Sequence, residues 1–341
     1  MDDSLKEVVI VGAVRTPIGA YKGSLKKIQA QELGSTVIKG VLAKSNFEKE
    51  DIDEVIMGQV LTAGSGQNPA RQAAINAGIS VSKPAHIINQ VCGSGLRAVI
   101  SGYQSIKLGE VKNVISGGQE NMSLSPHSIF FRDQKEILRE NLVDTMIQDG
   151  LLDAFNNYHM GMTAENVANK FGISRKEQDN YALHSQKKTR DAINQNKFDE
   201  EIIPVNHSGL NFKKDEHPRL DLKISDLEKL KTVFKENGSV TAGNSSGIND
   251  GAAALILTTL QEAKIRSIQP LAKISSWASV GVDPSVMGLG PIEAIKQAVK
   301  KARWKLEEID LFEINEAFAA QSIAVINELK IDQSKVNVNG G

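Results

Sequence analysis

Apolar and polar residues follow two kinds of pattern along the first third of the chain. Short apolar runs are typical of buried strands, and apolar residues that recur every three or four positions are typical of helices. The predicted order is strand 8–11, helix 30–44, strand 55–57, a helix from Pro69, strand 87–88, a helix from Gly93 and strand 114–115. This alternation predicts an α/β fold of βαβ units, with helices packed on a mostly parallel sheet.

The helix that begins at Pro69 has clear boundary signals. Asn68 is a favourable N-cap, and Pro69 stands where a helix needs no N–H donor. Gly78 can end the helix in a left-handed conformation. We therefore expect a short helix with well-defined ends.

The pattern changes between residues 122 and 240. Charge-rich helical segments dominate there, Ser174 and Glu177 form a predicted capping box, and residues 206–218 are irregular. We expect this stretch to be a mainly helical insertion. The alternation then resumes, with predicted strands at 253–257, 272–274 and 311–314 and a helix at 291–302.

An internal repeat links the two alternating parts. Residues 50–58 can be aligned with residues 307–315, and a helical pattern precedes and follows each segment. The shared context predicts a duplicated fold. In the first copy the next strand leads to Cys92, whereas in the second copy residues 336–339 approach the equivalent place and the sequence stops at Gly341. We therefore expect the second half to be incomplete.

Composition narrows the classes of function. The 341 residues suffice for two domains of about 150 residues each. A formal charge of −1 gives no general attraction to nucleic acid or to an anionic membrane, so we expect neither as a partner. The N-terminus is acidic where a targeting peptide would be basic, and the single cysteine cannot form an internal disulfide. These features predict a cytoplasmic protein.

The single cysteine, Cys92, stands where a predicted strand meets a predicted helix. The helix dipole and unpaired backbone N–H groups at such a place lower the pKa of a thiol from its usual ~8.5 and favour the thiolate. Gly93 and Gly95 allow a ligand to approach the backbone closely. A buried, inert cysteine is the alternative. The Gly-Ser-Gly sequence at a helix start favours the reactive one.

The segment around Cys92 resembles the acylated-cysteine signature of the thiolases, with Ile-Asn-Gln-Val-Cys-Gly-Ser-Gly-Leu at residues 88–96. Further segments similar to thiolase motifs follow in order along the whole chain. They are Val-Arg-Thr-Pro (14–17), Gly-Gly-Gln-Glu-Asn-Met-Ser (117–123), Tyr-His-Met-Gly (158–161), Val-Thr-Ala-Gly-Asn-Ser-Ser-Gly (240–247), Gly-Leu-Gly-Pro (288–291) and Asn-Glu-Ala-Phe (315–318). Tyr-His-Met-Gly is more similar to the biosynthetic thiolases, which act on acetyl-CoA, than to the long-chain degradative ones.

The resemblance implies a duplicated βαβ thiolase-like fold of layered sheets and helices. It implies an N-terminal half formed by residues 1–121 and 241–269, and a C-terminal half formed by residues 270–341. Residues 122–240 would be an inserted loop domain that binds coenzyme A.

The resemblance also implies an activity. Cys92 would attack the thioester of acetyl-CoA and carry the acetyl group, because a thiolate is both a strong nucleophile and a good leaving group. Asn315 would act through a water molecule to stabilise the enolate oxygen of a second acetyl-CoA; its alternative interpretation is a turn or an N-cap before Glu316. The product would be acetoacetyl-CoA, in fatty acid metabolism, and the enzyme a homodimer or homotetramer.

Coenzyme A thioesters would be substrates, with no permanently bound cofactor. Arg219 would lie near the nucleotide phosphates, and Lys213 and Lys214 either add charge or form a solvated loop face. Ser225 or Asp226 stands where the family has a serine near the adenine. The other implied contacts are Ser246 and Ala242 along the pantetheine, Phe234 at the adenine, and His159, Met160, Met287 and Phe318 along the tunnel to the thiol.

The family continues with a Gly-His-Pro segment that carries the base for the nucleophile and a Cys-x-Gly segment that carries a second cysteine. Neither follows residues 337–341 in this sequence, so we expect condensation to be impaired. Two alternatives remain: a decarboxylating ketosynthase and a non-catalytic protein that binds acyl-CoA or another subunit. The spacing of the six histidines builds no metal site with one thiol.

Overall fold

The computed structural model describes residues 7–132 and 138–341. The chain divides into two compact units, which are described separately. The first contains Met1–Gly150, Asp199–His217 and Ile248–Ile274, and the second contains Leu151–Phe198, Pro218–Gly247 and Ser275–Gly341. These units do not follow the boundaries expected at residues 121, 240 and 269, and that three-part division stays a prediction.

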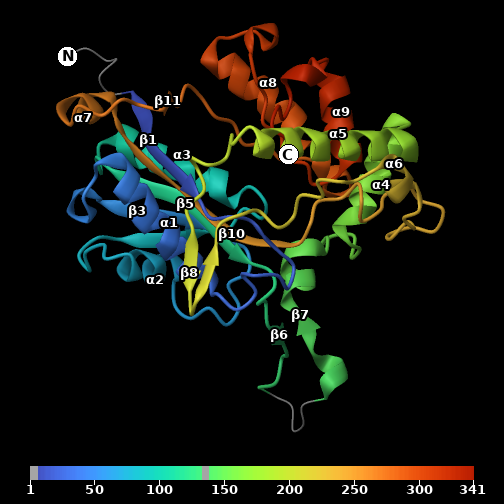
Figure 1. Ribbon diagram of the computed structural model, residues 1–341, viewed down its shortest axis with the longest axis horizontal. Coiled ribbons are helices and arrows are strands. Elements are labelled where there is room, and N and C mark those ends of the chain that lie inside the picture. Colours follow the sequence, from blue (N-terminus) through green and yellow to red (C-terminus); the bar gives the residue numbers. More distant parts are fainter. Residues whose placement is uncertain (1–6, 133–137) are drawn as a thin grey trace. The chain divides into compact units, whose positions relative to one another are not determined.

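The first unit contains a seven-stranded sheet, in the order β11-β1-β10-β5-β3-β4 with β2 paired to β10 (Figure 1). The strands are β1 (Val8–Arg15), β2 (Gly19–Ala20), β3 (Glu54–Gly58), β4 (Ala85–Ile88), β5 (Val114–Asn121), β10 (Asn249–Thr259) and β11 (Ala272–Lys273). The predicted strands are confirmed here, but the expected mostly parallel sheet is wrong. β10 enters between β1 and β5 and is antiparallel to both, so only the β5-β3-β4 part is parallel.

Helices cover both faces of this sheet, as the alternation of side chains along β3 shows. Val55 and Met57 belong to the apolar core beneath α1 (Ala30–Ser45) and α2 (Pro69–Asn76). Ile56 points to the other face and joins the core beneath α3 (Ser94–Leu108). Successive residues of a strand point to opposite faces, so a continuous apolar run identifies a strand buried on both sides. α7 (Leu260–Ile265) and the short 3₁₀ helix Lys49–Asp51 complete the helices of this layer.

The predicted ends of α2 are confirmed. The Asn68 side chain accepts a hydrogen bond from the Arg71 N–H, and Pro69 is the first helical residue. Gly78 follows the helix with a φ of +89°, a conformation in which glycine is far less strained than other residues.

The second unit is mainly helical and is organised around α9 (Ala319–Leu329). Ala320 and Ala324 pack with α4 (Met160–Phe171), and Val325 and Leu329 pack with α5 (Arg175–Asn194). The Ser174 and Glu177 capping box at the start of α5 is confirmed. The remaining helices are α6 (Ile224–Glu228), α8 (Gly290–Ala302) and the 3₁₀ helices Pro284–Leu289, Leu306–Glu308 and Gln333–Lys335.

The strand expected at residues 311–314 is not formed. Phe312 makes one isolated parallel bridge with Val336, through hydrogen bonds to the backbones of Lys335 and Asn337. Only alternate residues of this run, Phe312 and Ile314, are buried. The side-chain pattern is therefore that of a strand, but the backbone pairs at one position only.

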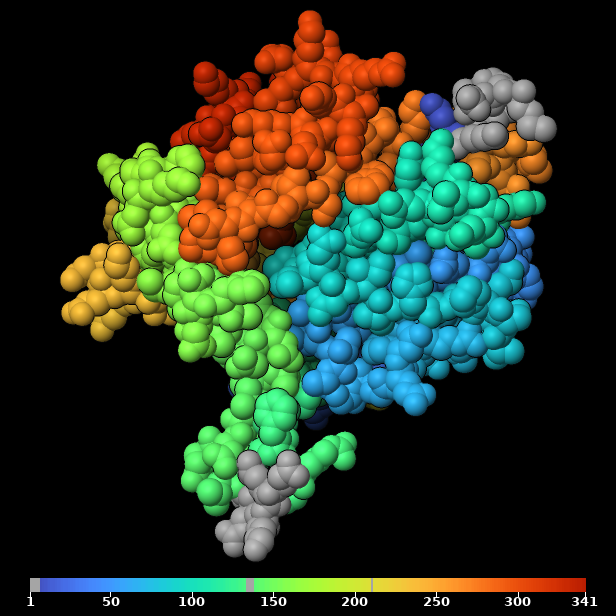
Figure 2. Space-filling model, turned by 180° about the vertical axis from the view of Figure 1, so that it is seen from behind, coloured from blue at the N-terminus to red at the C-terminus, as the bar shows by residue number. Residues whose placement is uncertain are grey.

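The stretch from 122 to 240 is less helical than expected. It contains the strand pair β6 (His127–Ser128) and β7 (Val143–Asp144), followed by the π-helical turn Met146–Leu151. β6 and β7 lie in the green segment that projects from the surface in Figure 2. The predicted irregular stretch 206–218 also contains most of the hairpin of β8 (Val205–His207) and β9 (Leu210–Phe212). Ser208 and Gly209 close this hairpin with positive φ angles, which suit a two-residue turn. The 3₁₀ turn Arg139–Asn141 lies between β6 and β7.

Candidate active site

A strained turn presents Cys92 between β4 and α3 in the first unit. Val91 has a φ of +47°, a left-handed conformation that a β-branched residue rarely adopts. Hydrogen bonds hold it there: its N–H donates to Asn89 Oδ1 at 2.9 Å, and its C=O accepts from Ser94 Oγ at 2.5 Å. Ser94 Oγ also accepts from the Gln90 N–H at 2.8 Å. Both ends of the turn are therefore tied to one serine of the helix.

The turn rests on glycines of the sheet. A Cβ at Gly58, the last residue of β3, would lie 2.4 Å from the Ser94 carbonyl carbon and 2.5 Å from the Gly95 nitrogen. A Cβ built on Gly95 of α3 would lie 4.0 Å from the Cα of Gly118, which belongs to the neighbouring strand β5. Only a residue without a side chain allows the first turn of α3 to lie this close to the strand end.

Cys92 is an exposed free thiol. The expected lowering of its pKa is wrong for this structure. Although water reaches the residue, the protein atoms around the sulfur raise the pKa of Cys92, and the carboxylate of Glu120 adds to that effect, while the backbone N–H of Cys92 acts in the opposite direction. The helix start thus favours the thiolate less than the desolvation and the nearby acid disfavour it.

Glu120 is a further functional candidate, within the motif at residues 117–123, for which the sequence predicted no role. Its carboxylate accepts the N–H of Val60 at 2.8 Å and that of Leu61 at 3.3 Å. Burial, together with the negative charge of Asp250, raises the pKa of Glu120 to about 7 despite these hydrogen bonds. The available signal was an acidic residue directly after an uncharged run, residues 114–119.

In the second unit, a small aromatic and apolar cluster brings together five of the residues expected to contact coenzyme A. The rings of His159 and Phe234 stack with centroids 4.6 Å apart, and Phe318 meets Phe234 edge-on at 6.3 Å. Met160 and Met287 pack against the same buried core. These residues come from four separate parts of the sequence, and the fold places them side by side.

The imidazole of His159 is mostly uncharged near neutral pH. Burial lowers the pKa of its imidazole below the ordinary value. Its Nδ1 accepts the backbone N–H of Gly161 at 3.0 Å, which leaves Nε2 to carry the proton of the neutral ring. The cluster is therefore neutral as well as apolar.

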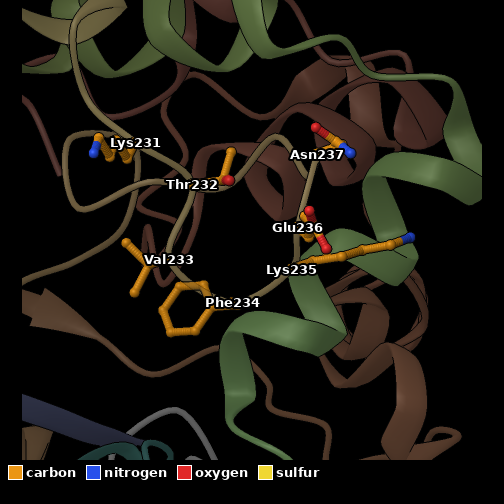
Figure 3. Close-up of a pocket in the computed structure, with 7 residues that line it drawn as sticks. All are labelled: Lys231, Thr232, Val233, Phe234, Lys235, Glu236 and Asn237. Atoms are coloured by element: carbon orange, nitrogen blue, oxygen red, sulfur yellow. The ribbon is translucent and has the colours of Figure 1, made fainter.

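A hollow of about 480 Å³ adjoins Phe234 and is lined by residues 231–237 (Figure 3). In Figure 3 the ring of Phe234 and the side chain of Lys235 point in opposite directions. The segment between α6 and β10 thus presents an apolar ring on one side and a cation on the other.

The other expected coenzyme A contacts lie in exposed loops. Ala242 and Ser246 are exposed on the loop that precedes β10, and the Ser246 N–H donates to the Ala317 C=O at 3.0 Å. Arg219 is also exposed, and its backbone N–H donates to Gln186 Oε1 at 2.8 Å. The structure thus joins the serine loop to the segment that carries Phe318, next to the aromatic cluster.

Asn315 is exposed in the second unit, whereas Cys92 belongs to the first. A buried residue, Asn337, holds both neighbours of Asn315. Its amide oxygen accepts the Ile314 N–H at 2.8 Å, and its amide nitrogen donates to the Ile314 C=O at 2.8 Å and to Glu316 Oε1 at 2.7 Å. No role of Asn337 was predictable from the sequence, since an asparagine near the end of an apolar run gives no signal by itself.

Of the remaining candidates, Ser225 and Asp226 both lie in α6, where Asp226 Oδ2 accepts the Lys223 N–H at 3.1 Å. Lys213 and Lys214 are exposed residues of the first unit, whereas Arg219 belongs to the second. Within residues 7–132 and 138–341, no three His, Cys, Asp or Glu side chains converge as metal ligands would. No helix among these residues has the length and apolar character needed to span a membrane.

Comparison with known proteins identifies the family. The model of the thiolase N-terminal domain matches residues 8–261, and that of the thiolase C-terminal domain matches residues 268–341. The chain belongs to the thiolase family. The expectation of a thiolase enzyme is thereby confirmed.

The thiolase is similar to several proteins named acetyl-CoA acetyltransferase. It is 51% identical to that of Pseudomonas aeruginosa, over 99% of this chain and 87% of the relative. It is 50% identical to the cytosolic acetyl-CoA acetyltransferase of Mus musculus, over 98% of this chain and 86% of the relative. The crystal structure of the Bacillus anthracis acetyl-CoA acetyltransferase matches with a TM-score of 0.96 and 40% identity, over 100% of this chain and 87% of that one.

These comparisons confirm the thiolase fold and correct one expectation. The expected incompleteness of the second half finds no support, because the C-terminal domain model matches residues 268–341 and the solved structure matches the whole chain. The expectation rested on the internal repeat, in which residues 336–339 approach the position that Cys92 has in the first copy and the sequence stops at Gly341.

Proposed function

We propose that this thiolase is an acetyl-CoA acetyltransferase that carries the acetyl group on Cys92. The observation that supports this most directly is the strained turn at Val91, which places an exposed thiol at the start of α3. Strain held by several hydrogen bonds at one residue is a feature of functional sites. The acetyl-CoA acetyltransferases at about half identity over nearly the whole chain support the choice of substrate.

The first half-reaction transfers the acetyl group. The thiolate of Cys92 attacks the thioester carbonyl of acetyl-CoA, a new C–S bond forms, and the bond to the sulfur of coenzyme A breaks. The leaving coenzyme A thiolate takes up a proton, which balances the proton that Cys92 lost. No oxidant or reductant is required.

The second half-reaction forms the carbon–carbon bond. A second acetyl-CoA loses an α-proton, and its carbanion attacks the acetyl-cysteine carbonyl. A C–C bond forms, the bond to the Cys92 sulfur breaks, and acetoacetyl-CoA is released. The Cys92 thiolate takes up a proton, which balances the α-proton that was lost. We propose that Asn315 helps to stabilise the enolate oxygen through a water molecule. Its neutral amide serves as a donor at any physiological pH, and the hydrogen bonds of Asn337 to the residues on either side fix its position. The reverse sequence is thiolysis.

We propose that the second unit binds coenzyme A. Arg219 suits the phosphates, because a guanidinium forms charge-assisted hydrogen bonds to them. The neutral cluster suits the uncharged pantetheine and thioester, since apolar walls with few polar groups suit a flexible ligand. The proposed contacts are Phe234 at the adenine, Ser246 and Ala242 along the pantetheine, and His159, Met160, Met287 and Phe318 near the thiol.

The test is acetylation of the purified chain by acetyl-CoA, with the host's own thiolases removed. Intact-mass and peptide analysis should find one acetyl group on Cys92 and one equivalent of released coenzyme A. Cys92→Ser should abolish the fast label, because a serine hydroxyl is a much weaker nucleophile than a cysteine thiol near neutral pH. Coenzyme A binding without acetyl transfer would contradict the proposal and favour a binding protein.

We further propose that the enzyme uses coenzyme A thioesters without a permanent cofactor, that it is cytoplasmic, and that it forms a homodimer or homotetramer. The mouse relative is named cytosolic, which supports the location. Light scattering on the purified chain tests the assembly, and a monomer at micromolar concentration would contradict it.

A further inference from the structure

Glu120 lies on β5, the strand that packs beneath the Cys92 turn. Gly118, two residues before it, pairs with Gly58 of β3 and lies against Gly95 of α3. The Glu120 carboxylate itself reaches the backbone beyond β3, where it accepts the N–H groups of Val60 and Leu61. It therefore ties the end of one central strand to the loop that leaves the next.

A short series of hydrogen bonds continues from that loop to the nucleophile. The C=O of Val60 accepts from Asn89 Nδ2 at 3.5 Å, and Asn89 Oδ1 accepts the N–H of Val91 at 2.9 Å. Val91 is the strained residue directly before Cys92. Glu120 is thus linked through Val60 and Asn89 to the conformation that presents the thiol.

Among the residues that the structure describes, the charged group that acts on Glu120 is acidic. Asp250 of β10 acts on it electrostatically, Glu216 acts on Asp250 in turn, and the Cys92 thiol is influenced by the Glu120 charge. The N–H groups of Val60 and Leu61 are the donors that stabilise the ionised form.

We propose that Glu120 is a positioning residue for Cys92, which holds the Val60–Asn89–Val91 connection and sets the reactivity of the thiol through its charge. This inference rests on the proposed function of Cys92 as the nucleophile. An ionised Glu120 opposes loss of the thiol proton, because two negative charges would then lie close together. A neutral side chain at this position makes the thiolate easier to form.

The test is the rate of Cys92 alkylation by iodoacetamide as a function of pH, followed by mass. Cys92 is the only cysteine, so the incorporated label reports on this thiol alone. We expect the midpoint of the profile to move to lower pH in Glu120→Gln, with alkylation faster by about threefold or more at pH 8, because one negative charge that opposes loss of the thiol proton is removed. A midpoint equal to or above that of the unsubstituted chain overturns the charge effect.

Two further variants separate charge from position. Glu120→Asp keeps the charge on a shorter side chain, so the alkylation midpoint should stay while hydrogen exchange at Val60 and Leu61 becomes faster. Unchanged exchange overturns the positioning role, and this variant tests it even if Glu120→Gln fails to fold. Asp250→Asn removes a neighbouring charge but keeps the acceptor for the Ser123 N–H. It should leave the midpoint of Cys92 in place, and a shift equal to that of Glu120→Gln overturns the specific role of Glu120.

Acetylation of the unsubstituted chain by acetyl-CoA is measured alongside. It tests the proposed function by itself, whereas alkylation requires no coenzyme A. A chain that is alkylated as expected but never acetylated contradicts the function and leaves the Glu120 inference standing.

Discussion

The Cys92 turn and the aromatic cluster around Phe234 are built in different ways. In the turn, backbone packs against backbone. No side chain would fit at Gly58 beneath Ser94, and Val91 is held in a left-handed conformation. In the cluster, side chains from separate segments meet, with His159 and Phe234 stacked face to face. The comparison indicates that the proposed nucleophile is fixed by a rigid sheet, whereas the proposed ligand surface is made of rings that can adjust. Rigid placement suits a reacting atom.

Gly58→Ala should have the largest effect, because the added carbon meets backbone atoms at 2.4 and 2.5 Å, and these cannot move without displacing α3. We expect a loss of about 3 kcal/mol or more in the free energy of unfolding, at the upper end for overpacked positions. Chemical denaturation measures it. A loss below about 1 kcal/mol would show that the turn can shift, and the contrast between the two regions would fail.

The charge of Glu120 should give the next largest effect. Folding raises its pKa from 4.5 to about 7, so the unfolded chain releases this proton first as the pH rises. The raised pKa therefore contributes stability that is present below pH 4.5 and is lost as the pH rises through about 7. Since a shift of one pKa unit corresponds to ~1.4 kcal/mol, the free energy of unfolding falls by about 3 kcal/mol over this pH range.

Glu120→Gln lacks this titration. At pH 8 we expect the variant to be more stable than the unsubstituted chain by about 2 kcal/mol, after about 1 kcal/mol is lost with one amide hydrogen bond. At pH 4.5 the advantage should vanish. Denaturation at both pH values measures the difference, and an equal difference at the two would show that Glu120 is ionised throughout.

Gly161→Ala is the matched substitution in the second unit. Its added carbon would lie 2.2 to 2.3 Å from atoms of the Phe234 ring, which is a side chain and can tilt away. We expect a smaller loss of about 1–2 kcal/mol and a weaker affinity for coenzyme A, because the His159 stack is disturbed. Denaturation and calorimetric titration measure the two effects. A loss as large as that of Gly58→Ala would mean that the cluster is as rigid as the turn.

The sequence predicted the first unit better than the second. Runs such as Val55 to Met57 are apolar because both faces of the strand are buried, and that signal is local. The antiparallel entry of β10 is a property of long-range topology that no local pattern records. In the second unit, the run around Phe312 has strand-like alternation without a partner along its length.

The candidate site shows the same limit. Cys92 could be found from its glycine-rich surroundings, but the pKa of its thiol could not, because Glu120 is distant in sequence and its effect depends on three-dimensional proximity. The stacking of His159 on Phe234 joins residues 75 positions apart and is likewise invisible to periodicity. Motifs gave the residues, whereas only the fold gave their neighbours.

Arg219→Ala should have the smallest effect, and it tests whether the ligand surface of the second unit extends beyond the rings. Arg219 is exposed, so water and salt screen its contacts with a phosphate. We expect the Kd for coenzyme A to rise about fivefold, or ~1 kcal/mol, with less effect at high salt and an unchanged kcat at saturation. Lys214→Ala is the matched control, since it removes one exposed cation from the same stretch of sequence and should change Kd less than about twofold. If kcat at saturation falls while Kd holds, Arg219 acts on the reacting atoms, and the division between a rigid catalytic turn and an adaptable binding surface has to be redrawn.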